Sequence, residues 1–195
     1  DVAATAIKAV APDRTLLGYE QTYNSLLSLV WTDEYTPFEY VHFEYDSAYN
    51  PVYGLGDTQN LFSQTGRYIY GKAVDYTNSQ EIAAAFDRET ETLMTFAGGS
   101  VTAMSDNGVA FINDVPYYLG TTSYVVDVVN DPENQVPIID WMLDEHGFDL
   151  YNYIQDGVIT IGASADGRTI LGITNTDMGW LTYVIDLDGE PMPEK

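Results

Sequence analysis

Residues 163–172 read ASADGRTILG, and this stretch decides the fold because the chain repeats it. Related stretches occur at residues 10–18 (VAPDRTLLG), 62–71 (FSQTGRYIYG) and 104–113 (MSDNGVAFIN). The copies follow one another at about 40–60 residues, an interval that matches one small supersecondary unit. Four irregular units therefore account for the whole chain.

Each copy predicts a β-hairpin. Gly66, Gly108 and Gly167 follow short polar residues, and such pairs reverse the chain because glycine accepts a positive φ. In the first copy we assign the glycine's place to Asp13. The segments on both sides of each turn are short and rich in β-formers. A third strand is expected after each hairpin, and in most units a fourth, such as residues 92–96.

Three or four short antiparallel strands per unit are typical of propeller blades. We therefore expect an all-β, antiparallel repeat fold that is β-propeller-like with about four irregular blades. The approximate units are residues 5–50, 51–97, 98–136 and 137–190 of a single domain spanning 1–195, which could be a fragment of a longer protein. The alternative is an antiparallel β-sandwich whose hairpin turns resemble one another.

One segment departs from this pattern. Residues 137–146 (PIIDWMLDEH) predict a short amphipathic helix that ends at Gly147 and packs on the final unit as a lid. We expect Trp141 and Met142 to be largely buried. The acidic residues of the helix should face water, since burying a charge without a partner is costly; they are Asp140, Asp144 and Glu145.

Composition limits the function classes. The 195 residues carry 7 Lys and Arg against 30 Asp and Glu, a net charge of −23, and a surface of that sign repels nucleic acid and anionic lipid. Hydrophobic residues make up 45% of the chain, which is enough for a folded core. The chain has no cysteine, so disulfides, thiolate metal sites and thiol nucleophiles are excluded. No apolar run approaches the ~20 residues of a transmembrane helix, and the first residues lack the features of a signal peptide.

The helix and the last repeat together carry a family resemblance. Residues 138–143 (IIDWML), 147–150 (GFDL) and 162–172 (GASADGRTILG) resemble, in the same order, the HAF-type repeat of bacterial secreted and autotransporter proteins. The match covers roughly residues 138–188, whereas the three earlier units carry only the turn and strand. The resemblance implies a secreted or surface-displayed β-repeat module, with an extracellular, cell-surface or periplasmic location. It offers no catalytic residues.

The residues themselves give no support for catalysis. Carboxylate pairs such as Asp140 with Asp144, or Glu89 with Glu91, occur by chance among 30 acids and do not specify a glycosidase. His42 and His146 stand in no metal or nucleophile motif. We expect no enzymatic activity and no cofactor.

The alternative to a chain without a cofactor is a chain that binds a calcium ion. Oxygen donors gather at strand ends, in Asp75, residues 127–131 and residues 186–190, but no twelve-residue calcium loop is present. Ordinary Asx turns explain the same aspartates, and we favour them.

Tyrosine is unexpectedly frequent, with 16 residues. Aromatic rings beside carboxylates can stack on sugars or anchor a protein interface, so the early cluster is a candidate ligand platform. It comprises Tyr35, Tyr40, Tyr45, Tyr49 and Tyr53. The alternative, which we favour, is that residues 38–45 form one strand with alternate side chains in the core.

The sequence thus favours a non-enzymatic, secreted or cell-surface β-repeat module that mediates protein or glycan binding. Two alternatives stay open, a purely structural segment of a larger surface protein and a hydrolase that gathers acids at a propeller centre. Protein and carbohydrate are the expected partner classes. The sequence does not fix the oligomeric state.

Overall fold

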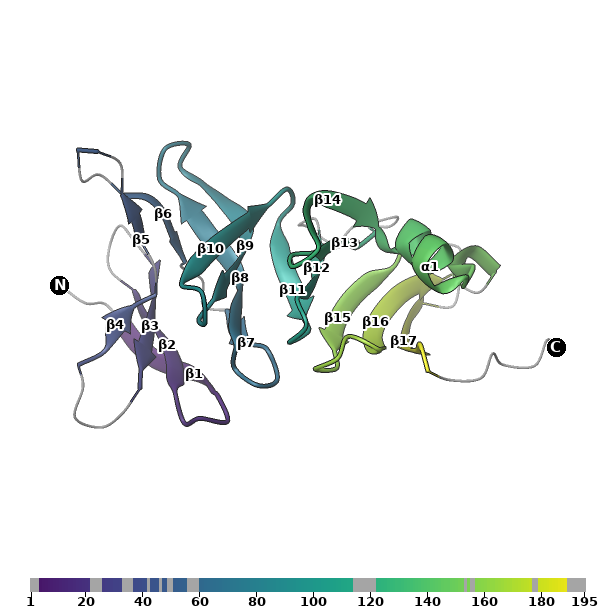
Figure 1. Cartoon of the computed structure of the whole chain (residues 1–195), viewed down its shortest axis with the longest axis horizontal. Coiled ribbons are helices and arrows are strands. Elements are labelled where there is room, and N and C mark those ends of the chain that lie inside the picture. Colours follow the sequence, from purple (N-terminus) through teal and green to yellow (C-terminus); the bar gives the residue numbers. More distant parts are fainter. Residues whose placement is uncertain are drawn as a thin grey trace.

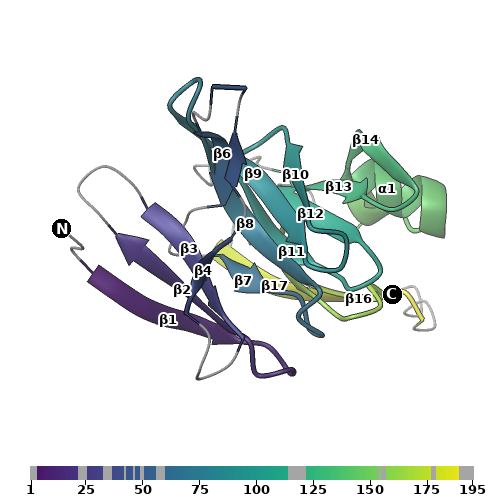
Figure 2. The ribbon, with the colours of Figure 1, turned by 60° about the vertical axis from the view of Figure 1, so that its left-hand side comes forward.

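A computed structural model describes most of the chain, as residues 4–21, 26–32, 37–41, 43–45, 47–48, 51–55, 60–113, 122–152, 154, 157–176 and 179–188. Within these residues, strands predominate and a single α-helix occurs. Four antiparallel sheets follow one another in chain order (Figures 1 and 2), and Figure 1 shows the first and last sheets at opposite ends of the long axis. The predicted all-β, antiparallel repeat architecture is therefore confirmed.

The first two sheets occupy the N-terminal half. Sheet 1 has the order β1-β2-β3-β4 and consists of β1 (Ala4–Val10), β2 (Leu16–Gln21), β3 (Leu26–Trp31) and β4 (Glu39–Tyr40). Sheet 2 has the order β10-β9-β8-β6-β5, and β7 also pairs with β8. Its strands are β5 (Phe43–Tyr45), β6 (Pro51–Leu55), β7 (Leu61–Phe62), β8 (Tyr68–Asp75), β9 (Gln80–Asp87) and β10 (Thr92–Phe96).

The other two sheets lie in the C-terminal half. Sheet 3 has the order β11-β12-β13-β14 and consists of β11 (Ser100–Met104), β12 (Val109–Asn113), β13 (Tyr124–Asp127) and β14 (Asp131–Pro137). The helix α1 (Ile138–His146) and the 3₁₀ turn η1 (Leu150–Asn152) follow. Sheet 4 has three described strands, β15 (Ile159–Ala163), β16 (Thr169–Thr176) and β17 (Gly179–Asp186).

The middle sheets are buried on both faces. Successive residues of a strand point to opposite faces, so adjacent apolar residues supply two different cores. On β12, Ala110 and Ile112 pack toward sheet 2, whereas Phe111 packs toward sheet 4 and α1. On β13, Val126 and Val125 divide in the same way. This explains why short apolar runs, rather than strict alternation, mark these strands in the sequence.

The four repeated turns are equivalent hairpins. They join β1 to β2, β7 to β8, β11 to β12 and β15 to β16, and all four lie toward the lower edge of Figure 1. Gly66, Gly108 and Gly167 each adopt a positive φ, and each donates its N–H to the carbonyl of the serine three residues earlier. That serine's hydroxyl in turn accepts the N–H that opens the next strand, as Ser164 does from Thr169 at 2.9 Å.

The first turn corrects one assignment. Arg14, not Asp13, has the positive φ, at 71°, and its N–H bonds to the carbonyl of Ala11 at 2.9 Å. Asp13 instead accepts the N–H of Thr15 at 2.9 Å as an Asx turn. The assignment of the glycine's place to Asp13 is therefore off by one residue, because the first turn is one residue shorter: Ala11 N–H donates to the carbonyl of Thr15, whereas Ser164 N–H donates to the carbonyl of Thr169.

The last glycine of each repeat has a separate cause. A Cβ at Gly18 would contact the Trp31 ring, and a Cβ at Gly172 would overlap the Tyr183 ring of the neighbouring strand. In the third copy Asn113 replaces this glycine, and its side-chain amide donates to Thr102 Oγ1 at 3.0 Å and to the carbonyl of Thr160 at 3.1 Å. The position thus serves close contact across the sheet rather than chain reversal.

The helix agrees with its prediction except at the tryptophan. Met142 is fully buried, Asp140, Asp144 and Glu145 are exposed, and Gly147 ends α1 in the left-handed conformation. Trp141 is only half-buried and lines a cavity, and its ring packs edge-on against Phe111 at 6.1 Å.

Candidate binding cavity and the turn row

A cavity of about 460 Å³ opens between the β13–β14 hairpin and α1. Polar side chains dominate its wall, with four carboxylates and two amides, from Asp127, Asp131, Asp144, Glu145, Asn130 and Asn134. Trp141, Val125 and Val136 supply its apolar part. Among the described residues that line it, none is a lysine or arginine. The cavity is therefore an anionic recess with one aromatic ring.

The hairpin loop that forms one wall is held by its own aspartate. Asp127 ends β13 and accepts the N–H groups of Val129 and Asn130 at 3.0 and 2.9 Å, and the Asn130 side-chain amide at 2.8 Å. Asp131 accepts the Asn134 amide at 3.0 Å. These bonds fix the loop locally and use both oxygens of Asp127, while Asp131 accepts through Oδ2 alone and its Oδ1 keeps lone pairs for a ligand.

The opposite wall is the exposed side of α1. Asp144 and Glu145 project from its last turns, and Trp141 lies one turn earlier. The Trp141 ring packs edge-on against His146 at 4.6 Å. Burial lowers the pKa of His146, an effect that Glu145 opposes and Arg168 reinforces. A neutral imidazole beside the tryptophan leaves the carboxylates as the charged groups of this recess at neutral pH.

An aromatic face flanked by carboxylates suits two kinds of ligand group. A cation gains from both the carboxylates and the ring quadrupole, and a sugar can stack on the ring while its hydroxyls donate to the acids. Across the described part of the chain, no cluster of three or more His, Cys, Asp or Glu side chains has the arrangement of a metal site.

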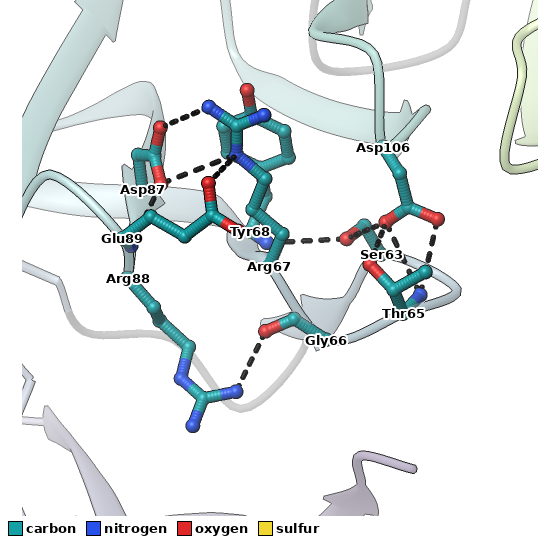
Figure 3. A network of polar contacts seen from close by, with 9 residues as sticks. All are labelled: Ser63, Thr65, Gly66, Arg67, Tyr68, Asp87, Arg88, Glu89 and Asp106. Carbon is teal, nitrogen blue, oxygen red and sulfur yellow. Dashed lines mark hydrogen bonds and ion pairs between the residues drawn. The ribbon is translucent and has the colours of Figure 1, made fainter. Parts of the chain in front are cut away.

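The second polar feature is the turn row, the four repeated turns at residues 11–15, 63–67, 105–108 and 164–168. Figure 3 shows its centre, where Asp106 of the third turn accepts the Thr65 N–H at 3.1 Å, the Thr65 hydroxyl at 2.7 Å and the Ser63 hydroxyl at 2.5 Å from the second turn. Arg88 donates to the carbonyl of Gly66 at 2.7 Å. The same guanidinium reaches Thr15 Oγ1 in the first turn at 2.8 Å.

The fourth turn joins the row through backbone groups. Asp106 N–H donates to the carbonyl of Ala165 at 2.7 Å, and the Asn107 side chain donates to the carbonyl of Asp166 at 2.9 Å. Ala165 N–H donates to Gln64 Oε1 at 3.0 Å, across 101 residues of sequence. Hydrogen bonds therefore connect all four units at one end of the sheets, and the polar groups of the turn row contact one another.

A salt bridge supports the turn row from sheet 2. Arg67 contacts Asp87 at 2.9 Å and Glu89 at 3.3 Å, and its guanidinium lies 4.8 Å from the centre of the Tyr68 ring (Figure 3). Burial alone would raise the pKa of Asp87, but the hydrogen bonds from Arg67 and from the Glu89 N–H outweigh it and hold that pKa below its ordinary value. Glu89 is therefore part of an ion-pair network, which explains its place without a catalytic role.

The predicted tyrosine platform is distributed over two sheets. Tyr40 lies on β4 of sheet 1, whereas Tyr45 and Tyr53 lie on β5 and β6 of sheet 2. Tyr35 and Tyr49 fall outside the described residues, as does His42. The single strand expected over residues 38–45 is wrong, because the chain bends at Val41 and passes from sheet 1 to sheet 2. The platform itself stays a prediction.

In the described residues, candidate calcium-binding aspartates accept hydrogen bonds from neighbouring backbone groups. Asp75 accepts the N–H groups of Thr77 and Asn78 at 2.9 and 3.1 Å, and Asp186 accepts the N–H of Asp188 at 3.1 Å. Hydrogen bonding, first from the Asn78 side chain, lowers the pKa of Asp75. These contacts have the geometry of the Asx turns that we favoured.

Sequence reasoning missed the cavity. It assigned Trp141 to the core and treated Asp144 and Glu145 as solvated surface, and it considered residues 127–131 only as cation ligands. The available signal was the acid- and amide-rich stretch DPEN at residues 131–134, immediately before the helix. What brings that stretch opposite α1 is the pairing of β14 with β13, which no local pattern displays.

No protein-family model matches the sequence, and no curated protein matches it. A solved structure from a structural and mechanistic analysis of two prolyl endopeptidases is similar in fold, with a TM-score of 0.58 and 9% sequence identity. The similarity covers 97% of this chain but only 28% of that chain, so this chain spans less than a third of its structural neighbour. In the described part of the chain no helix has the length and apolarity to cross a membrane. At this identity the likeness concerns the fold alone, a β-propeller-like succession of antiparallel sheets.

Proposed function

We propose that this chain is a non-enzymatic, secreted or cell-surface β-repeat module that binds a protein or glycan, and that the cavity beside Trp141 receives the ligand. The observation that carries the proposal is the composition of that cavity, with four carboxylates around one half-buried indole ring. Ligand sites are concave and combine an apolar surface with a few convergent polar groups. The secreted location rests on the resemblance of residues 138–188 to the HAF-type repeat.

The charges of the cavity favour a cationic group as its occupant. Asp144 and Glu145 are exposed at the rim, and no described lining residue neutralises them. A lysine or arginine side chain of a partner protein would therefore gain attraction without displacing an internal ion pair. A glycan would use the same ring by stacking, which makes it the second ligand class of the same site.

The test compares the chain with a charge-matched pair of variants. Asp131→Asn/Asp144→Asn removes two cavity carboxylates, whereas Glu39→Gln/Glu91→Gln removes two exposed carboxylates elsewhere. Binding is measured against a glycan array and against a peptide library rich in lysine and arginine. We expect each ligand of the wild-type chain to bind the cavity variant at least tenfold more weakly. The same ligand should bind the control variant with unchanged affinity.

Two outcomes would contradict the proposal. One is the absence of any saturable ligand in either library. The other is an equal loss of binding in both variants, which would mean that the net charge of −23, and not the cavity, attracts the ligand.

A purely structural role is a second candidate, and the turn row is the observation that favours it. The repeated turn motif forms hydrogen bonds between the second, third and fourth units. A chain with that role alone would leave both libraries unbound.

A further inference from the structure

His146 ends α1 next to the candidate cavity, although it is not among the described residues that line it. Its imidazole packs edge-on against the Trp141 indole, with 4.6 Å between the two ring centres. Trp141 supplies the aromatic ring of the cavity wall. A change of charge on the imidazole therefore reaches the cavity through the ring on which a ligand group would lie.

The surroundings of His146 determine the pH at which that charge changes. Partial burial has the largest influence and lowers the pKa of the imidazole, Glu145 on the same helix raises it, and Arg168 in the turn between β15 and β16 lowers it. An unperturbed histidine titrates near pH ~6.5. The imidazole is therefore neutral at neutral pH, and it gains a proton from solvent in mildly acidic solution because the residue is exposed.

The other charged groups around the end of α1 come from three neighbouring elements. Arg168 contacts Asp188, which follows β17, at 2.9 Å. From the β13–β14 hairpin, Asp127 and Asp131 line the cavity opposite the helix. Asp149, just before η1, accepts hydrogen bonds within its own turn. The imidazolium of His146 would thus place a positive charge against the aromatic ring of an otherwise anionic recess.

A positive charge at this place opposes a cationic ligand in two ways. It repels the ligand's own charge, since both charges would interact with the same indole ring. It also balances part of the negative charge of Glu145, which is both a neighbour of His146 and a residue of the cavity wall. An uncharged ligand group that stacks on the ring meets neither effect.

We propose that His146, acting through the Trp141 ring, sets the charge preference of the cavity: the neutral imidazole admits a cationic side chain of a partner, and the imidazolium expels it. This role of His146 rests on the proposed function of the same cavity. His146 is a positioning residue in this account, because the ligand contacts the indole and the carboxylates and not the imidazole. A partner bound at neutral pH is released in mildly acidic surroundings.

The test uses the full chain and two replacements at this exposed helix position. His146→Gln is neutral at every pH, His146→Lys stays positive, and His42→Gln removes the other histidine of the chain as a control. The probe is a Gly-Gly-Arg-Gly-Gly peptide with blocked ends. Its affinity is measured from the NMR shift of the Trp141 indole N–H, which Trp141→Phe identifies by its loss.

The three charge states of residue 146 give three expected affinities. The wild-type chain and His42→Gln should bind the peptide about fivefold more weakly near pH ~5 than near pH ~8. His146→Lys should bind weakly at both pH values. His146→Gln should bind at both nearly as the wild-type chain does near pH ~8, and any loss that it shows belongs to carboxylates that all the proteins share.

The indole resonance also reports the titration without peptide. Between the same pH values it should follow a single titration curve in the wild-type chain, and that curve should be missing in His146→Gln. A curve retained in His146→Gln, or an affinity that falls equally with pH in His146→Gln and the wild-type chain, overturns the role of His146 and leaves the cavity a binding site. No binding of the arginine peptide at either pH overturns that role too, whereas the proposed function fails only if the glycan and peptide libraries also yield no ligand.

Discussion

The turn row and the core between sheets 3 and 4 join neighbouring units by opposite means. The turn row uses hydrogen bonds among half-exposed polar groups, centred on Asp106, and its residues come from the repeated motif. The core uses Phe111, Ile138 and Met142, all fully buried, and α1 belongs to one unit only. The difference teaches that the polar turn residues of the motif align the units, while buried apolar residues, some inside the repeated stretches such as Phe111 and some outside them such as Met142, form the core between the units.

The largest effect should come from removing the ring at the centre of that core. Phe111 has no exposed surface and contacts both sheet 4 and α1. Phe111→Ala should lower the free energy of unfolding by about 3–5 kcal/mol, through lost burial and a residual cavity. Trp141→Ala should cost less, because the indole is only half-buried. Urea denaturation of both variants checks the order, and a larger loss at Trp141 would contradict it.

A second prediction separates close packing from glycine content in general. A methyl group at Gly172 would overlap the Tyr183 ring and the carbonyl of Ile159, whereas one at Gly162 would meet Leu171 at an ordinary 3.7 Å. Gly172→Ala should therefore destabilise by about 1–3 kcal/mol through overpacking. Gly162→Ala is the matched control on the same sheet and should leave the denaturation midpoint nearly unchanged. Equal shifts would contradict the assigned role of the repeat's last glycine.

These glycines also show what the sequence can and cannot predict. The turn positions of Gly66, Gly108 and Gly167 could be predicted, because a positive φ strongly favours glycine and the residue type therefore indicates the conformation. Arg14 adopts the same conformation although it is not a glycine, so the positive-φ position of the first turn was wrongly assigned to Asp13. The helix could be predicted from its apolar period and from Gly147. The burial predicted for the Trp141 side chain was too high, because the spacing of apolar residues along the helix does not show that a cavity borders the ring.

The candidate site depended on contacts that are distant in sequence. Gln64 meets Ala165, and the loop around Asp127 faces α1, only after the sheets are stacked. The spacing of residues in the sequence predicts neither of these contacts. The path of the chain at Val41 was missed for a related reason, since an alternating run of aromatic residues reads the same whether one sheet or two use it.

The third prediction concerns the salt bridge beside the turn row. The pKa of Asp87 is lower in the folded chain than in the unfolded chain, so its ionised form stabilises the fold. That contribution is complete above the unfolded value near pH ~4 and is lost as pH falls through the lower folded value. Asp87→Asn should cost about 1–2 kcal/mol at neutral pH and should flatten the acid side of the stability profile.

Urea denaturation at a series of pH values measures this profile. Glu133→Gln removes an exposed carboxylate from β14 and serves as the control. Its stability should follow the wild type at every pH. An Asp87→Asn variant whose acid profile parallels the wild type would show that Arg67 does not stabilise the ionised carboxylate.

The smallest effect should come from the turn row itself. Asp106→Ala removes three acceptor contacts to Thr65 and Ser63, but these groups are partly exposed and water replaces much of what is lost. We expect a loss of about 0.5–1.5 kcal/mol. Asp144→Ala, at an exposed helix position, should change stability by less than about 0.5 kcal/mol.

A double-mutant cycle with Thr65→Ala then isolates the contact between the second and third turns. If the turn row joins units, the sum of the two single losses should exceed the loss in the double variant, because both substitutions remove the hydrogen bond from the Thr65 hydroxyl to Asp106. Additive losses would mean that Asp106 acts only within its own turn. In that case the repeated motif would serve the hairpins one at a time, and the buried cores alone would hold the units in a row.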